Sequence, residues 1–255
     1  MPPALKRIGI GIGDDAEKVI RSAGAVSDRV LVTVYCRPET VSRKNAASGS
    51  FSFSPHAEPH EALIADLMSS AIDAGVRGTL SANATLKALK KATGVDHLER
   101  IALLETVDGK KFLLAPVGVD EGWTVGEKLA FIKKAKEIAG RFGIPQDVGI
   151  LSGGRFGDIG RHRQVDASMA DAELVARLGG GKHFEILIED AVRHCGIIIA
   201  PDGISGNLIF RTLVFLGGGH SHGAPVLNIG KIFVDTSRAS PNYTNALMLA
   251  ASLLD

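Results

Sequence analysis

The 255-residue sequence predicts an α/β protein with a mostly parallel sheet. Short β-branched runs alternate with amphipathic stretches almost from end to end, a pattern typical of strands joined by helices. Several of these runs are continuously apolar, as expected of strands that helices cover on both faces. Hydrophobic residues make up 45% and charged residues 22% of the chain, which are ordinary values for a globular protein.

Seven apolar runs are expected to form strands, and the first helix lies between the first two. The runs are residues 7–12, 29–35, 100–104, 111–117, 148–152, 196–200 and 225–230. Asp14 is placed to cap a helix over 15–23, with Gly24 in position to end it.

Two later helices also have clear start signals. Thr124 and Glu127 have capping-box spacing, which predicts a long helix that a glycine at 140 or 143 closes. Ser240, followed by a proline, predicts the start of a terminal helix over 241–254. That helix is apolar on most faces, so it is expected either in the core or at a subunit interface.

Composition disfavours several classes of protein. The net charge of +1 and the lack of a basic tract argue against nucleic-acid binding. No stretch approaches the roughly 18 apolar residues of a membrane span. Cys36 and Cys195 lie beside apolar runs without metal-ligand spacing, as reduced, buried thiols do. We therefore expect a cytoplasmic protein that does not associate with a membrane.

Two stretches are expected to be irregular. Residues 36–58 are rich in Ser, Pro and basic residues, so this stretch is expected to be a functional or mobile loop. Residues 152–164 (SGGRFGDIGRHRQ) follow a predicted strand and carry Arg155, Arg161 and Arg163. A glycine-rich turn at the carboxyl end of a strand can bind an anion; the alternative is a solvated basic loop.

The glycines of GIGIG at 9–13 allow two interpretations. Gly-x-Gly-x-Gly after a first strand is compatible with a nucleotide loop of the S-adenosylmethionine or dinucleotide type. Those loops work with an acidic residue at the end of the second strand, where this chain has Val34-Tyr35-Cys36-Arg37. The pattern therefore favours an edge strand softened by glycine.

Two short motifs each follow a strand and precede a helix. In PDGISGN at 201–207, Ser205 or Asn207 is placed to cap a helix whose free N–H groups bind an anion. In DTSR at 235–238, Arg238 offers a planar fork suited to phosphate or carboxylate. Taken singly, each motif is equally compatible with an ordinary turn.

The order of SGGRFG, PDGISGN, Gly217–Gly219 and DTSR resembles the phosphate acetyl/butyryltransferase family. The resemblance is clear over 196–255 and fainter over 76–160, where LSANATLKAL places Lys87 near a position at which that family carries an arginine. Across its whole length the chain resembles the MtxX family, short relatives of the phosphotransacetylases that are labelled methyltransferase subunits and methanogenesis markers.

The resemblance implies a two-domain fold of the isocitrate/isopropylmalate dehydrogenase-like type, with mostly parallel sheets, usually as a homodimer. Residues 1–119 and 230–255 would form one α/β domain and 120–229 the other, with a cleft between them. The ligand would be phosphate-bearing or coenzyme-like, with coenzyme A or another thiol as candidates. The resemblance also implies a homodimer and partners in a methyltransferase complex.

The same resemblance assigns roles to individual residues. Ser237 and Arg238 match the family's catalytic pair. Basic residues supply charge for the anion and the polar ones orient the ligand. The ligand-binding candidates are Lys87, Arg155, Asp202, Ser205, Gly206 and Asn207.

Departures from the family pattern leave the chemistry open. Thr244 stands near where the family has the aspartate that deprotonates the thiol, and Ala239 replaces a glycine. Asp158 is a possible substitute acid or base. The leading hypothesis is an MtxX-like transferase; the alternatives are a phosphate acyltransferase with a rearranged base and a non-catalytic ligand-binding or assembly protein. The Asp-x-His-x-x-Gly corrinoid motif is absent, and metal binding by His220 and His222 is not expected.

Overall fold

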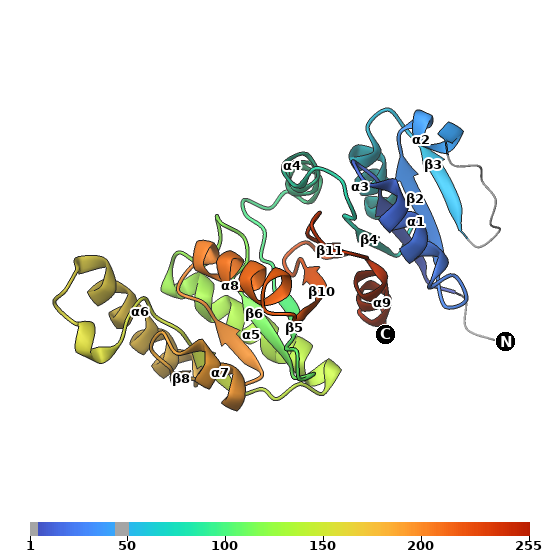
Figure 1. Cartoon of the computed structure of the whole chain (residues 1–255). Coiled ribbons are helices and arrows are strands. Elements are labelled where there is room, and N and C mark those ends of the chain that lie inside the picture. The colour runs from blue at the N-terminus through green and yellow to red at the C-terminus, as the bar shows by residue number, and fades with distance from the viewer. Residues whose placement is uncertain (1–4, 44–50) are drawn as a thin grey trace. The chain divides into compact units, whose positions relative to one another are not determined.

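The computed structural model of the chain describes residues 5–43 and 51–255. Backbone contacts divide the chain into two compact units (Figure 1): the residues up to Leu98 with His222–Asp255, and Glu99–Ser221. The boundaries expected from the sequence, after residue 119 and before residue 230, lie further along the chain than these divisions. Both units alternate strands with helices, as the sequence predicts for an α/β protein.

The first unit is built on a parallel sheet. Its strands lie in the order β3-β2-β1-β4-β11, all parallel, with β10 antiparallel to β11. The elements are β1 (Arg7–Gly11), α1 (Ala16–Gly24), β2 (Leu31–Cys36), α2 (Pro38–Arg43), β3 (Ser52–Pro55), α3 (Pro59–Met68), β4 (Ala74–Val76), α4 (Ala82–Thr93), β10 (His220–Pro225), β11 (Ile232–Asp235) and α9 (Thr244–Ser252). β10 begins two residues before the division between the units.

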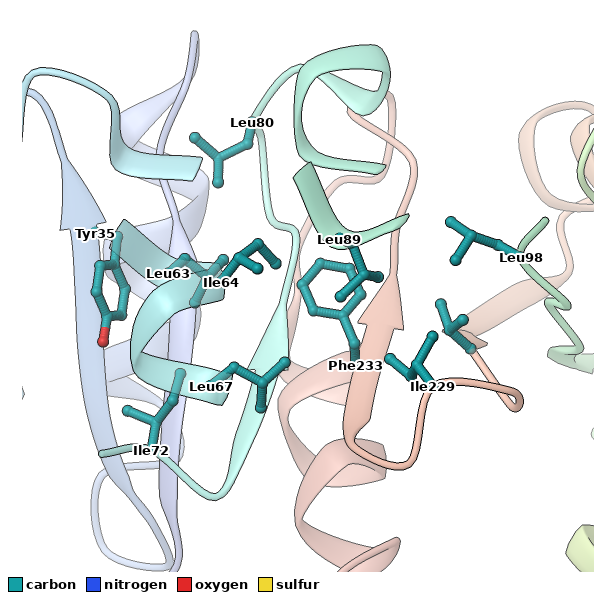
Figure 2. Close-up of a cluster of buried hydrophobic side chains, with 11 residues drawn as sticks. Tyr35, Leu63, Ile64, Leu67, Ile72, Leu80, Leu89, Leu98, Ile229 and Phe233 are labelled. Carbon is teal, nitrogen blue, oxygen red and sulfur yellow. The ribbon is translucent and has the colours of Figure 1, made fainter. Parts of the chain in front are cut away.

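One core cluster of the first unit lies between α3, α4 and the sheet. Figure 2 shows side chains of α3, such as Leu63 and Leu67, pointing toward the same interior as Leu89 of α4 and Phe233 of β11. A Cβ on Gly9 would lie within 2.8 Å of side-chain atoms of Ile72, Leu63 and Tyr35. Gly9 therefore lets α3 pack closely on a central strand. The expectation that GIGIG is an edge strand is wrong, because β1 pairs with β2 on one side and β4 on the other.

The second unit has a sheet of its own order, β5-β6-β9-β7-β8, in which only β5 is antiparallel to its neighbour. The elements are β5 (Ala102–Glu105), β6 (Lys111–Ala115), α5 (Val125–Phe142), β7 (Val148–Ile150), a 3-10 turn η1 (Phe156–Asp158), α6 (Arg163–Gly179), β8 (Lys182–His183), α7 (Ile188–His194), β9 (Ile197–Ile199) and α8 (Gly203–Phe215). The chain crosses from β6 to β7 and from β7 to β8 in one direction, then returns to β9. Right-handed crossovers therefore place α5 and α6 on one face of this sheet and α7 on the other.

Helix ends were predicted with mixed success. The capping box at Thr124 and Glu127 is confirmed, and α5 is closed by Gly143 with a φ of 64°. The cap assigned to Asp14 is wrong, because Asp15 accepts the N–H of Lys18 at the start of α1.

The start of the terminal helix was also misplaced. The chain remains irregular through Ser240 and Pro241, and α9 begins only at Thr244. The physical reason is Tyr243, whose buried ring and N–H (to Ser22 Oγ, 2.8 Å) anchor the preceding turn to α1.

The apolar runs of the sequence did not predict β3, β4, β8, β10 or β11. The run 225–230 is not a strand: β10 ends at Pro225, and the following turn reaches Gly230, which has a φ of 64°. Val226 and Ile229 in this turn are apolar because they pack into the core.

Of the stretch 36–58, the structure describes α2 and β3, while residues 44–50 lie outside the described part. No helix among the described residues is long and apolar enough to cross a membrane.

Candidate functional site

Candidate site residues gather at the carboxyl ends of parallel strands in each unit. In open α/β sheets this edge, where strands end and helices begin, is where ligands bind. In the first unit β1, β4 and β11 end there, followed by the loop at 12–15, the loop at 77–81 and the DTSR turn. In the second unit β6, β7, β8 and β9 end at one edge, which carries the loop after Ser152 and the PDGISGN motif.

The first half of the DTSR turn is a structural brace. Asp235 forms a buried ion pair with Arg77, whose Nη1 also donates to Leu80 O over 2.8 Å. Thr236 donates its N–H to Asp235 Oδ1 (2.8 Å) and its hydroxyl to Gly78 O (3.0 Å). These bonds fasten the turn to the loop that follows β4. Asp235 and Thr236 therefore hold the turn in place and are not free to contact a ligand.

The second half of the turn is open. The guanidinium of Arg238 is 57% exposed and its Nη1 donates to Asp14 Oδ2 over 2.9 Å, while the Asp14 side chain is 77% exposed. Such an exposed pair contributes at most about 1 kcal/mol, so an anionic ligand can displace the carboxylate. Ser237 Oγ accepts the N–H of Ala239 (3.2 Å), and Lys18 Nζ donates to Arg238 O (3.2 Å).

Tyr243 supports this turn from beneath. Its hydroxyl donates to Ser237 O over 3.2 Å, and burial raises the pKa of Tyr243 to about 12. Thr244, at the family's aspartate position, is the first residue of α9. The carboxylate that contacts the DTSR turn is instead supplied by Asp14. Lys87 lies in the middle of α4 in the same unit, with an exposed side chain.

The glycines of GIGIG are explained by close packing. A Cβ on Gly11 would lie 2.0 Å from the Leu80 side chain, and one on Gly13 would lie 2.4 Å from Thr79 O. The N–H of Gly13 donates to Thr79 Oγ1 over 2.9 Å. The loop thus uses its glycines, and this amide, to contact the chain after β4, so it does not fit the phosphate cradle of an S-adenosylmethionine or dinucleotide site.

The PDGISGN motif packs the start of α8 against residues 116–121. A Cβ on Gly203 would lie 1.5 Å from Gly118 O, and one on Gly206 would lie 1.9 Å from Pro116 O. Asn207 Nδ2 donates to Val117 O over 2.9 Å. Gly206 and Asn207 therefore have structural contacts that account for their residue types.

The cap of α8 differs from the expectation. Asp202, not Ser205 or Asn207, is the N-cap, since Asp202 Oδ1 accepts the N–H of Ser205 over 2.8 Å. The N–H of Gly203 donates to Glu121 O (3.0 Å). Two amides that were expected to bind an anion are thus already bonded within the protein.

A buried carboxylate supports this segment. Glu121, only 1% exposed, accepts the N–H of Gly118 (3.2 Å) and both the N–H (3.2 Å) and Nε (2.6 Å) of Arg100. Burial raises the pKa of the Glu121 carboxyl, although the neighbouring Arg100 opposes this shift. Removing one partner of such a pair is costly, so we regard it as part of the frame of this edge.

Backbone N–H groups of the glycine-rich loop after β7 donate to side chains of the same unit. The N–H of Arg155 donates to Asp158 Oδ2 (2.9 Å) and that of Phe156 to Glu185 Oε2 (2.7 Å). Gly153 N–H donates to Ser168 Oγ and Gly160 N–H to Asp166 Oδ1. The backbone N–H of Arg155 and the side chain of Arg161 lower the pKa of Asp158. What this loop offers to an anion is the exposed Arg155 side chain rather than these four amides.

Three side chains that the sequence did not mark as site residues form a hydrogen-bonded chain at this edge. His183 Nε2 lies 2.8 Å from Ser152 Oγ, and its Nδ1 lies 2.7 Å from Glu173 Oε1. His183 ends a two-residue strand and Glu173 lies within α6, so neither position carries a local signal. Asp14, the partner of Arg238, was likewise assigned only to a helix cap. Within the described ranges, no group of three His, Cys, Asp or Glu side chains is arranged to hold a metal ion.

The candidate residues thus fall into two sets. Lys87, Ser237 and Arg238 belong to the first unit. Arg155, Asp202, Ser205, Gly206 and Asn207 belong to the second. In the first unit the structure brings Asp14 to the Ser237-Arg238 pair; in the second it places Gly206 and Asn207 against residues 116–121, while Asp202 caps α8.

The fold is that of phosphotransacetylases. A branched-chain phosphotransacylase from Enterococcus faecalis superposes with a TM-score of 0.72, at 16% identity, over 98% of this chain and 100% of that one. A phosphotransacetylase from Streptococcus pyogenes superposes with a TM-score of 0.68, at 17% identity, over 98% and 94%. These similarities show the fold class alone.

Sequence relatives are more specific, although the chain matches no protein-family model. "Putative methyltransferase mtx subunit X" of Methanosarcina barkeri is 46% identical over 97% of this chain and 93% of that protein. The protein of the same name from Methanosarcina mazei is 46% identical over 97% and 90%. An "uncharacterized methyltransferase" of Methanopyrus kandleri is 41% identical over 97% and 98%. The chain belongs to the mtx subunit X family, built on a phosphate acyltransferase scaffold.

Proposed function

We propose that this chain is a transferase subunit of methanogenesis that binds a phosphate-bearing or coenzyme-like ligand through Arg238. The observation that carries the proposal is the exposed guanidinium at the carboxyl end of β11, held only loosely by the exposed Asp14. Charge-assisted bidentate contacts make arginine well suited to phosphate. The relatives' name, methyltransferase, supports group transfer as the reaction class.

Ligand binding by calorimetry tests this proposal. The probes are inorganic phosphate, acetyl phosphate and coenzyme A. Arg238→Ala is expected to weaken binding of at least one probe by about tenfold or more, the usual value of a charged hydrogen bond. The matched control is Arg29→Ala, which removes another exposed arginine (66% exposed, beside Asp28) and is expected to leave binding unchanged. Equal binding by wild type and Arg238→Ala would overturn the proposal.

The reaction is tested separately from binding. We expect the chain, alone or with a partner subunit, to transfer a methyl group to a thiol coenzyme. The thiol loses its proton to solvent, a C–S bond forms, and the bond between the methyl group and its donor breaks. Mass spectrometry of mixtures containing a labelled methyl donor, either S-adenosylmethionine or a methylcorrinoid, would detect the thioether product. Arg238-dependent binding without any turnover would instead favour a non-catalytic ligand-binding or assembly protein.

A second candidate function is phosphate acyl transfer. It is favoured by the fold and by Asp14, whose carboxylate accepts a hydrogen bond from Arg238. Asp14 could therefore serve as the base that Thr244, at the family's aspartate position, does not provide. In this reaction Asp14 takes the thiol proton, and the thiolate sulfur attacks the carbonyl carbon of the acyl phosphate. A C–S bond forms and the C–O bond to phosphate breaks, so that phosphate leaves.

Phosphate-dependent release of coenzyme A from acetyl-coenzyme A is the same reaction in reverse, with protonated Asp14 returning the proton to the leaving thiolate, and it tests the second candidate. Asp14→Asn is expected to lower that rate by about 10²–10⁴-fold, the usual contribution of a general base. An unchanged rate would exclude Asp14 as the base, and no rate at high concentration of folded wild-type protein would exclude acyl transfer.

We also propose that the chain forms a homodimer through α8. Ile204 and Leu208 are exposed along this helix, and Leu216 is exposed directly after its last residue. Leu208 also lines an apolar pocket of about 620 Å³ in the same unit. A twofold axis near Leu208 would place the α8 of one copy against the pocket of the other. Leu208→Asp is expected to give monomers in analytical ultracentrifugation. Leu178→Asp, on α6 and also 61% exposed, is the control; dissociation by both or by neither variant would contradict the proposal.

A further inference from the structure

Three side chains of the second unit form a chain of hydrogen bonds. Ser152 is the second residue after β7, His183 ends β8, and Glu173 lies on α6. The His183 ring bridges the other two with distances of 2.7 and 2.8 Å. The side chain of His183 is only 4% exposed, while that of Glu173 is 56% exposed. A carboxylate on one ring nitrogen and a hydroxyl on the other fix the orientation of an imidazole.

The same turn contacts the glycine-rich loop at further points. Glu185 O accepts the N–H of Ser152 over 2.7 Å, and its carboxylate accepts the N–H of Phe156 over 2.7 Å. Glu185 has a φ of 57°, a left-handed conformation that is uncommon for a residue other than glycine. The Phe156 ring meets the His183 ring edge-on, with centroids 5.5 Å apart. Residues 183–185 therefore form a platform under the loop that carries Arg155.

Carboxylate, imidazole and hydroxyl in this order also form the triads of nucleophilic catalysis. Here the hydroxyl is not placed to attack a substrate. Ser152 is 1% exposed, and its Oγ also contacts Gly154 O (3.1 Å) and Met169 Sδ (2.9 Å). These neighbours surround the oxygen, so its bonds serve the conformation of the loop. In particular, Ser152 Oγ lies within hydrogen-bonding distance of both His183 Nε2 and the carbonyl oxygen of Gly154, one residue before Arg155.

We infer that His183, oriented by Glu173, is a positioning residue that holds the loop through Ser152 so that Arg155 is preorganised to bind an anion. The inference rests on the ligand class proposed above. A loop fixed before binding loses less conformational freedom when the ligand arrives, and this raises affinity without a direct contact.

Two substitutions of His183 separate its two bonds. The amide of glutamine can replace Nε2 and reach Ser152, whereas the shorter asparagine cannot. His183→Asn is therefore expected to weaken binding of inorganic phosphate or coenzyme A by up to about tenfold, the upper value for the loss of one hydrogen bond. His183→Gln is expected to recover most of that loss. His194→Asn, which changes an exposed histidine bonded to a backbone carbonyl of α7, is the control.

A double-mutant cycle with Arg155→Ala distinguishes positioning from general stability. Since His183 acts through Arg155, His183→Asn is expected to have no further effect on affinity once Arg155 is alanine. Hydrogen exchange provides a readout without ligand: exchange at the Arg155 amide is expected to be faster in His183→Asn than in His183→Gln. If wild type binds and His183→Asn loses thermal stability but keeps its affinity, the positioning role is wrong.

The inference and the proposed function fail in different ways. Wild-type protein that binds none of inorganic phosphate, acetyl phosphate and coenzyme A overturns the proposed function and, with it, the ligand-binding part of this inference. Wild-type binding that depends on Arg238 but is the same in His183→Asn overturns this inference alone. Equal loss of affinity in the Arg155→Ala background would also overturn it, because His183 would then act on binding by another route.

Discussion

Charged groups at the carboxyl edges of the two sheets differ in their exposure and in their hydrogen bonds. In the first unit an exposed arginine, Arg238, is paired with an exposed carboxylate, Asp14, and water screens both. In the second unit the loop amides are bonded to carboxylates of the same unit, and the Ser152–His183 contact is buried. The first edge can exchange its partner for a ligand at little cost, whereas the second is built to keep its shape. Arg238 is therefore held by an ion pair that a ligand can replace, whereas Arg155 is held by a loop of fixed conformation.

Both edges nevertheless use glycine in the same way. Gly13 lies against Thr79 O, and Gly206 lies against Pro116 O, at distances where a Cβ would clash with backbone. Motifs that resemble ligand-binding loops in the sequence are here contacts between neighbouring chain segments. The ligand-binding chemistry is therefore to be sought in side chains beside the glycines rather than in the glycine amides.

The largest expected effect is at the buried brace of the first edge. Asp235→Ala leaves the Arg77 guanidinium buried without its carboxylate, which is expected to cost about 3–5 kcal/mol of unfolding free energy. Urea denaturation measures this, with the milder Asp235→Asn if the alanine variant does not fold. Asp28→Ala, in an exposed pair, is expected to cost less than about 0.5 kcal/mol. Similar losses in both variants would contradict the distinction between brace and surface.

The second edge is tested by filling a glycine contact. Gly206→Ala places a Cβ 1.9 Å from Pro116 O and is expected to destabilise the protein by about 1–3 kcal/mol. Gly24→Ala, at the last residue of α1, meets no atom within 4 Å and is expected to cause no loss. Thermal unfolding of both variants checks the expectation; a fully stable Gly206→Ala would mean that α8 is not held against residues 116–121.

Alkaline pH is expected to weaken the support beneath the DTSR turn. Burial raises the pKa of Tyr243 to about 12 and raises that of Tyr35, which also donates to Asp66. The folded state therefore holds these protons more tightly than the unfolded chain. The resulting stability is complete below about pH 10 and is lost as pH rises toward 12, by about 1–2 kcal/mol for Tyr243.

Denaturation midpoints across this pH range, together with tyrosinate absorbance, measure the effect. The chain has two tyrosines, so Tyr243→Phe leaves Tyr35 as the reference. The variant is expected to lose its share of the pH dependence above pH 10. Titration of both tyrosines near pH 10 in the folded protein would be inconsistent with their burial.

The smallest expected effect concerns the exchangeable pair. Asp14→Asn frees Arg238 and is expected to raise the affinity for inorganic phosphate by about two- to fivefold, the value of an exposed ion pair. Asp28→Asn, which neutralises another exposed aspartate, is the control for a general change in charge. Lower affinity in Asp14→Asn would show that Asp14 helps to hold the ligand instead of competing with it.

Local signals in the sequence were reliable where the partners are a few residues apart. The capping box of Thr124 and Glu127 is an example, because both bonds form within one turn of helix. Continuous apolar runs likewise identified the central strands β6, β7 and β9. The prediction of which aspartate caps α1 was wrong. Asp15 is the cap, whereas Asp14 pairs with Arg238, 224 positions away.

The site residues show the same difference between contacts of near neighbours in the sequence and contacts of distant residues. By itself, the sequence determined the parallel α/β class, the strand–turn–helix context of PDGISGN and DTSR, and the membership of a recognisable family. Only the tertiary structure decided that the glycines pack against backbone, that Asp14 meets Arg238, and that His183 meets Ser152 across 31 positions. Hydrogen bonds within a turn depend on neighbouring residues, whereas these contacts exist only after parallel strands bring distant loops to one edge.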